Sequence, residues 1–155
     1  MAILTGRSRG TEDIDVIIPR LDDKTLDKLI AEFRAESYWC INQDLDEIDL
    51  FLEDGISVRI AKEGNIIPNF ELFYPEDQFD EEALDNRIKV QMSDEELFIS
   101  PLELQIAYKL FLGSEKDLED ALHLFCLFKD DLNRKRLNDL AKKLDVGEEL
   151  DELRS

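Results

Sequence analysis

The sequence contains few residues of the types on which several large functional classes depend. Among its 155 residues are two cysteines and one histidine. Cys40 and Cys126 lie far apart and form no CxxC pair, which argues against a disulfide framework and against a zinc site. The single histidine, His123, has no nearby serine or cysteine signature, which argues against a hydrolytic triad.

Long apolar runs are also missing. No stretch of the sequence is long enough to cross a bilayer, and the N-terminus lacks the apolar region of a signal peptide. We therefore expect a cytoplasmic protein that has no membrane partner. The hydrophobic fraction of 43% is nevertheless sufficient for a folded core, and 155 residues fit one domain.

Basic residues are scarce relative to acidic ones. Nineteen lysines and arginines stand against 38 aspartates and glutamates, which gives a net charge of −19. This charge repels phosphate backbones at long range, so we do not expect non-specific binding to nucleic acid or to anionic membranes. The simplest interpretation of the excess is a solvated surface that keeps the protein soluble. Action on a nucleic acid would require a local basic patch or a metal ion.

The pattern of apolar residues predicts an α+β fold whose second half is helical. We expect a small mixed β-sheet packed by helices in residues 1–99, followed by a C-terminal helical segment in residues 100–155, within one compact domain. Alternating or continuous apolar runs predict strands, and spacings of three and four predict helices. The expected strands are 14–18, 56–60, 70–74, 88–92 and 97–99, and the expected helices of the first part are 26–33, 45–52 and 79–86.

Several signals organise the C-terminal part. Residues 100–103, Ser-Pro-Leu-Glu, have the pattern of a capping box with proline at the first helical position. Further helices are expected from Ser114 and from near Asp131. Cys126 and His123 lie in the apolar run of the first of these, so Cys126 is expected to be buried and His123 to be a packed or capping side chain. The acidic tail after residue 147 is expected to fray.

Two aspartates stand at the start of the first expected strand. Because alternate residues of a strand share a face, Asp13 and Asp15 would point the same way, with Ile14 and Val16 against a buried core. Two carboxylates this close repel each other unless a cation lies between them, and Mg²⁺ prefers a few carboxylates together with phosphate oxygens. The pair therefore indicates a cradle for a metal-bound triphosphate. The alternative is an exposed strand edge without a ligand.

Other charged residues accompany this pair. Glu71 lies within the apolar sequence Phe-Glu-Leu-Phe of a later expected strand, where a carboxylate needs a metal, an arginine or solvent. An outward-facing position on a half-exposed strand is the alternative for Glu71. Arg7 and Arg9 precede the aspartates and are placed to meet phosphate charge.

Two stretches carry a resemblance to a known family. Residues 6–16, GRSRGTEDIDV, look like the R-x-T-x-D-I-D signature of the polymerase-beta-type nucleotidyltransferase superfamily. Residues 100–110, SPLELQIAYKL, followed by KDLED at 116–120, are similar to the S-P-E-x-L-I-x-x-K-L…K-D-x-x-D pattern of its small prokaryotic branch. That branch includes minimal nucleotidyltransferases and abortive-infection-type toxins. The order and spacing of the two stretches agree with it.

The resemblance implies an assignment of site residues. It assigns Mg²⁺ or Mn²⁺ to Asp13 and Asp15, with Glu71 as the third catalytic and metal-binding carboxylate. It assigns the NTP, expected to be ATP, to Arg7, Arg9, Thr11, Lys109 and Lys116. For the two lysines the alternative is a pair of solvated helix side chains. Asp117 and Asp120 are expected in salt bridges or at helix termini rather than as ligands.

The implied activity is transfer of a nucleoside monophosphate from an NTP to an acceptor hydroxyl, with release of pyrophosphate. The acceptor is left open among RNA, protein and a small molecule. The family usually has aspartate at the position of Glu71. It also has a Gly-Gly or Gly-Ser turn about a dozen residues before the first aspartate, whose N–H groups cradle phosphates. That turn would fall just before Met1, which leaves open a truncated chain or a natural variant without the cradle.

These departures keep a second hypothesis in view. It is a catalytically inactive nucleotidyltransferase-fold binding module, part of a toxin–antitoxin system, with a protein partner or a second copy of itself. A third hypothesis is an acidic helical scaffold in which the two aspartates are incidental, and it predicts no nucleotide binding at all.

Overall fold

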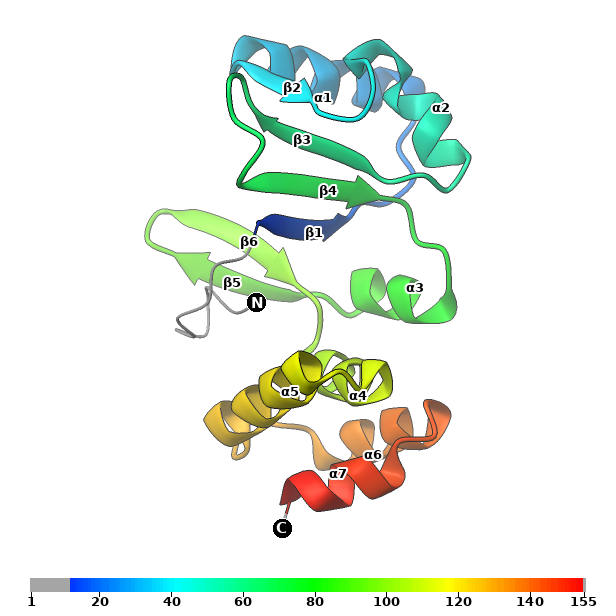
Figure 1. Ribbon diagram of the computed structural model, residues 1–155, viewed down its shortest axis with the longest axis vertical. Helices are drawn as coiled ribbons and strands as arrows, with labels where there is room; N and C mark the ends of the chain where they lie inside the picture. The colour runs from blue at the N-terminus through cyan, green and yellow to red at the C-terminus, as the bar shows by residue number, and fades with distance from the viewer. Residues whose placement is uncertain (1–11, 155) are drawn as a thin grey trace. The chain divides into compact units, whose positions relative to one another are not determined.

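The computed structural model describes residues 12–154 (Figure 1). Within them it has the predicted α+β fold, with seven α-helices and two small sheets. The described chain divides into two compact units, residues 12–84 and residues 85–154. The hairpin that precedes residue 100 groups with the helical unit, whereas we expected a boundary after residue 99. The expectation of a single domain stays a prediction.

The first unit contains a four-stranded sheet with the order β1-β4-β3-β2. β1 runs parallel to β4, while β4 with β3 and β3 with β2 are antiparallel pairs. Its strands are β1 (Asp13–Ile17), β2 (Tyr38–Cys40), β3 (Val58–Lys62) and β4 (Asn69–Phe73), and its helices are α1 (Asp23–Ala35), the 3₁₀ helix η1 (Leu45–Glu47), α2 (Ile48–Glu53) and α3 (Gln78–Asp85).

The core of this unit lies between one face of the sheet and the helices α1 and α2. Leu26 of α1 and Ile48 and Leu52 of α2 pack with strand residues that alternate onto that face. Asp22 caps α1, because its carboxylate accepts the Thr25 N–H at 2.7 Å. The buried strand residues are Cys40, Val58, Ile60 and Leu72, with Tyr74 just beyond β4.

The expectation of a buried first strand is wrong. β1 is an edge strand, and within residues 12–154 it pairs with β4 alone. Val16 packs against the core as predicted, but Ile14 is 38% exposed, and so is its partner in register Phe70, at 36%. In the part of the chain that the structure describes, the two aspartates therefore begin an edge strand of the sheet rather than a buried one.

The second unit consists of a hairpin and four helices. Its elements are β5 (Ile88–Met92), β6 (Glu95–Ile99), α4 (Leu102–Leu112), α5 (Glu115–Phe128), α6 (Arg134–Lys143) and α7 (Gly147–Arg154). α4 packs against each of the other three helices. Gly113 ends α4 in the left-handed conformation, with φ of 66°. Ser114 caps α5, the helix that the sequence predicts from this residue. Among residues 12–154, no helix combines the length and the apolar character needed to cross a bilayer.

Three expectations for this unit are wrong. The capping box does not form, because α4 begins after Pro101 and the Glu103 carboxylate instead accepts the Asn133 N–H at 2.7 Å. The acidic tail is a helix rather than a frayed end, because Leu150 of α7 is 2% exposed and packs into the core. Cys126 is exposed, since it lies two residues beyond the buried Leu124 and therefore on another side of α5.

Candidate functional site

The pairing of β1 with β4 brings the predicted acidic residues onto one face of the sheet. In the parallel register, Asp13 is the partner of Asn69, and Asp15 is the partner of Glu71. Partners in register point to the same side of a sheet, and neighbouring strands lie about 4.8 Å apart. Val16 and Leu72 alternate with these residues and face the core. The three acidic residues therefore lie on the face opposite α1 and α2.

β3 continues this row of polar residues. Arg59 is the antiparallel partner of Glu71, so Asp15, Glu71 and Arg59 occupy adjacent positions on three neighbouring strands. We call this side of the sheet the polar face and define it by Asp13, Asp15, Ser57, Arg59, Asn69 and Glu71. Among strands β1 to β4, Arg59 is the one basic residue that alternation places on it.

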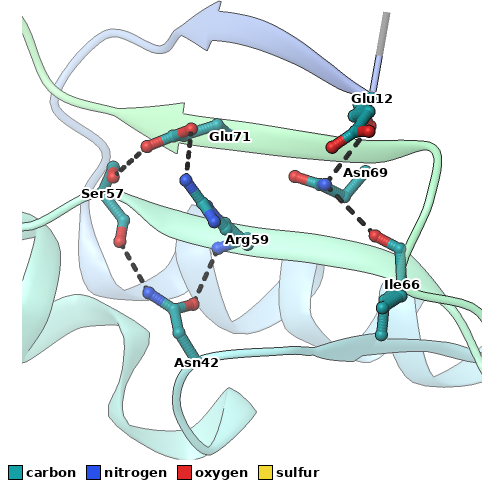
Figure 2. Close-up of polar contacts among 7 residues, drawn as sticks. All are labelled: Glu12, Asn42, Ser57, Arg59, Ile66, Asn69 and Glu71. Atoms are coloured by element: carbon teal, nitrogen blue, oxygen red, sulfur yellow. Dashed lines mark hydrogen bonds and ion pairs between the residues drawn. The ribbon is translucent and has the colours of Figure 1, made fainter.

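The Glu71 carboxylate is held by two side chains of the β3 segment. Its Oε1 accepts a 2.6 Å hydrogen bond from the Ser57 hydroxyl, and its Oε2 accepts one of 3.4 Å from Arg59 Nη2. Figure 2 shows the three side chains turned toward one another. The Glu71 side chain is 20% exposed and that of Arg59 is 49% exposed. Of the partners considered for Glu71, the one present in this structure is arginine, together with a hydroxyl group.

Asn42 fixes the backbone on which Ser57 and Arg59 stand. Its Nδ2 donates to the Ser57 carbonyl at 3.0 Å, and its Oδ1 accepts the Arg59 N–H at 2.9 Å (Figure 2). The Asn42 amide, which lies just after β2, therefore satisfies one carbonyl and one N–H group at the start of β3. No motif in the sequence marks Asn42, Ser57 or Arg59 as a site residue. The signal that could have identified Arg59 is its position as a basic residue between the apolar residues Val58 and Ile60 of a strand.

Asn69 anchors the start of β1. It is 7% exposed, and its backbone N–H and its Nδ2 both donate to the Glu12 carbonyl, at 3.0 and 3.3 Å. Nδ2 also donates to the Ile66 carbonyl at 3.2 Å (Figure 2). Asn69 Oδ1 is buried and accepts no hydrogen bond from the residues that the structure describes. Asn69 thus joins the chain just before Asp13 to the turn that leads into β4.

The donor chemistry of the polar face fits Mg²⁺ or Mn²⁺. Both aspartates are exposed, and carboxylate oxygens are the ligands that these cations prefer. Within residues 12–154, no three acidic, histidine or cysteine side chains are close enough to form a metal-binding group. The Glu71 carboxylate, which turns toward β3, would have to release Arg59 to join the two aspartates.

The two lysines assigned to the nucleotide belong to the helical unit. Lys109 Nζ donates to Asp117 Oδ1 at 3.2 Å and to Asp120 Oδ2 at 3.0 Å, which confirms the expected salt bridges of these aspartates. Burial raises the pKa of Asp117, but its bonds to Ser114 and Lys109 outweigh burial and hold that pKa below its ordinary value. Lys116 is exposed at the start of α5.

Three of the predicted nucleotide-binding residues lie outside the described part of the chain. They are Arg7, Arg9 and Thr11. Their assignment to phosphate remains a prediction from the sequence.

Comparison with known proteins gives no family. No protein-family model matches the sequence, and no curated protein matches it significantly. The family interpretation therefore rests on the two sequence motifs.

Proposed function

We propose that the protein is a metal-dependent nucleotidyltransferase that transfers a nucleoside monophosphate from an NTP, with ATP the expected donor. The observation that carries the proposal is the register of β1 and β4. It sets Asp15 beside Glu71, with Asp13 two residues away on the same face. This arrangement joins the D-I-D motif to the later acidic residue that the family resemblance requires.

In this proposal Asp13 and Asp15 would hold Mg²⁺ or Mn²⁺, with Glu71 as the third carboxylate. A metal held there would supply positive charge that offsets the negative charge of both the polar face and the substrate. A chain with a net charge of −19 repels a triphosphate at long range, so such an offset is needed for binding. Arg7 and Arg9 would add positive charge to the phosphates.

The reaction is a substitution at the α-phosphorus. The acceptor oxygen forms a bond to that phosphorus, and the bond from the phosphorus to the pyrophosphate oxygen breaks. The acceptor hydroxyl loses its proton, and we assign Glu71 to receive it. Ser57 donates to Oε1 of Glu71, so Oε2 is the oxygen that would take a proton or a metal, and it would first have to release its 3.4 Å contact with Arg59.

The proposal leaves the acceptor as RNA, a protein or a small molecule, and it places the reaction in the cytoplasm, where NTPs are available. The acidic surface disfavours a large RNA. We do not propose non-specific binding to nucleic acid.

Thermal unfolding tests the proposal directly. The wild-type protein is heated with Mg²⁺ alone and with Mg²⁺ plus each NTP. A ligand that binds only the folded state increases the free energy of unfolding, by about 2.7 kcal/mol at about 100 times its Kd, and so raises the midpoint temperature. Because Mg²⁺ alone stabilises an acidic protein non-specifically, the measured quantity is the further shift from the nucleotide. We expect that further shift in wild type and expect Asp13→Asn and Asp15→Asn to abolish it.

A matched control is Asp27→Asn, which removes the same charge from an exposed position on α1. It should keep the full nucleotide shift. Absence of a nucleotide shift in wild type would reject the proposal, as would an equal shift in all three variants.

The Glu71 contacts favour a second candidate function. A carboxylate already held by Ser57 and Arg59 suits a catalytically inactive module that binds a protein partner or a second copy, for example in a toxin–antitoxin pair. Such a module should keep its biological effect in Asp13→Asn and Asp15→Asn, whereas an enzyme should lose it. A growth assay with each variant separates the two functions.

A further inference from the structure

Arg59 differs from the other residues of the polar face in how it is held. Its backbone is fixed, because its N–H donates to Asn42 Oδ1 at 2.9 Å and its carbonyl accepts the Ile41 N–H at 2.7 Å. Among residues 12–154, its guanidinium makes one long contact, of 3.4 Å to Glu71, and the side chain is 49% exposed. Exposed ion pairs of this kind contribute little to stability.

The two oxygens of Glu71 are bound unequally. Ser57 holds Oε1 through a short bond of 2.6 Å, whereas Arg59 reaches Oε2 at 3.4 Å. If Glu71 were to bind a divalent cation, its longer contact with Arg59 is the one that it would give up, while the shorter bond from Ser57 would stay in place. The guanidinium that this releases would remain on the polar face, one strand away from the bound cation.

We propose that Arg59 binds the phosphates of the nucleotide, and that its ion pair with Glu71 is the contact it makes when no metal is bound. This assignment rests on the proposed function, since it requires a metal at Asp13, Asp15 and Glu71. The guanidinium presents several N–H donors in a planar fork that matches phosphate oxygens. It is also the one basic side chain that strands β1 to β4 place on this face.

The proposal predicts opposite effects on two ligands. Arg59 competes with the metal for Glu71, so Arg59→Ala should bind Mn²⁺ alone as well as wild type or more tightly. The same variant loses a phosphate contact, so its affinity for Mg²⁺·ATP should fall about tenfold, the ratio expected for one lost charge-assisted hydrogen bond. Arg59→Lys keeps the charge without the fork and should lie between wild type and Arg59→Ala.

Both affinities are measurable on the intact protein. Free Mn²⁺ is counted by electron paramagnetic resonance, and binding of Mg²⁺·ATP and of Mg²⁺·tripolyphosphate is measured by calorimetry, in about 0.15 M salt to screen non-specific attraction. The control is Arg34→Ala, which removes an equal charge from the exposed end of α1, where Arg34 pairs with Asp46. Arg34→Ala should match wild type toward every ligand. Trp39 fluorescence during urea unfolding reports whether each variant is folded.

Three results would overturn the assignment. If Arg59→Ala binds Mg²⁺·ATP as tightly as wild type, Arg59 makes no phosphate contact. If Arg59→Ala loses affinity for Mn²⁺ and for Mg²⁺·ATP by the same factor, Arg59 only positions Glu71. Wild type that binds neither ligand rejects the proposed function, and the assignment falls with it.

Discussion

Asp15 and Glu71 are partners in register on the parallel strands β1 and β4, although α1, β2, α2 and β3 separate them in the sequence. The strand order β1-β4-β3-β2 therefore creates the candidate site, because it places the first strand beside the last one of this sheet. The same order puts Arg59 on the other side of Glu71. One carboxylate is thus positioned between an acidic strand and a basic residue, and in this structure it pairs with the basic one.

Asn69 holds the start of β1, and two substitutions test this role. Asn69→Asp replaces a donor with acceptors that face the Glu12 and Ile66 carbonyls, and it buries a charge. We expect a loss of about 3 kcal/mol or more in the free energy of unfolding. Asn69→Ala also removes the unpaired Oδ1, so its loss should be smaller, about 1 kcal/mol.

The measurement is urea unfolding followed by the fluorescence of Trp39, the only tryptophan, which lies in the same unit as Asn69. The backbone N–H of residue 69 still reaches Glu12 in both variants, so a partly held β1 is expected in each. If Asn69→Ala loses no stability, the side-chain donor does not anchor the strand.

Lys109 and Asp120 form a part-buried ion pair in the helical unit, at 3.0 Å, with the Asp120 side chain 9% exposed. Lys109→Met leaves that carboxylate without its ammonium partner and should lower the free energy of unfolding by about 3 kcal/mol. The double variant, Lys109→Met with Asp120→Leu, should lose less free energy of unfolding than the sum of the losses in the two single variants. The control Lys116→Met alters an exposed lysine and should change stability by no more than about 0.5 kcal/mol.

Circular dichroism at the helix band during urea unfolding measures these losses, since the second unit is largely helical. Additive losses in the double variant would show that the two charges are not coupled. The result also bears on the assignment of Lys109 to the nucleotide, because a strongly coupled Lys109 must leave two carboxylates to reach a phosphate.

Local patterns in the sequence predicted much of the secondary structure. The alternation of Val58, Ile60 and their polar neighbours predicts β3, and the spacing of Asp13 and Asp15 predicts their shared face. Glu71 stands out as an acid among apolar residues. Each of these signals depends on neighbours in the sequence, so each is readable without the fold.

The remaining features depend on partners that are distant in the sequence. The register that joins β1 to β4 has no local signature, because it follows from how the strands pack on α1 and α2. Glu103 fits a capping box by spacing, yet its carboxylate instead satisfies the N–H of Asn133 at the start of α6. The acidic tail is ordered because Leu150 finds a core made by other helices.

Asp117 should make the stability of the helical unit depend on acid pH. Its bonds to Ser114 and Lys109 hold its pKa below the ordinary value of 3.8, although burial opposes this shift. A carboxyl group whose pKa is lower in the folded state stabilises that state above the pKa of the unfolded chain. The contribution is then lost as the pH falls through the folded value. The loss should therefore occur below about pH 4.

Urea unfolding followed by circular dichroism between about pH 6 and pH 2 tests this expectation. Asp117→Asn should be less stable than wild type near neutral pH, and the two curves should converge at the acid end. Asp130→Asn, at an exposed position just after α5, is the control and should follow wild type throughout. If the curves of wild type and Asp117→Asn stay parallel into acid, Asp117 titrates alike in the folded and unfolded chain. Ser114 and Lys109 would then not be holding its charge.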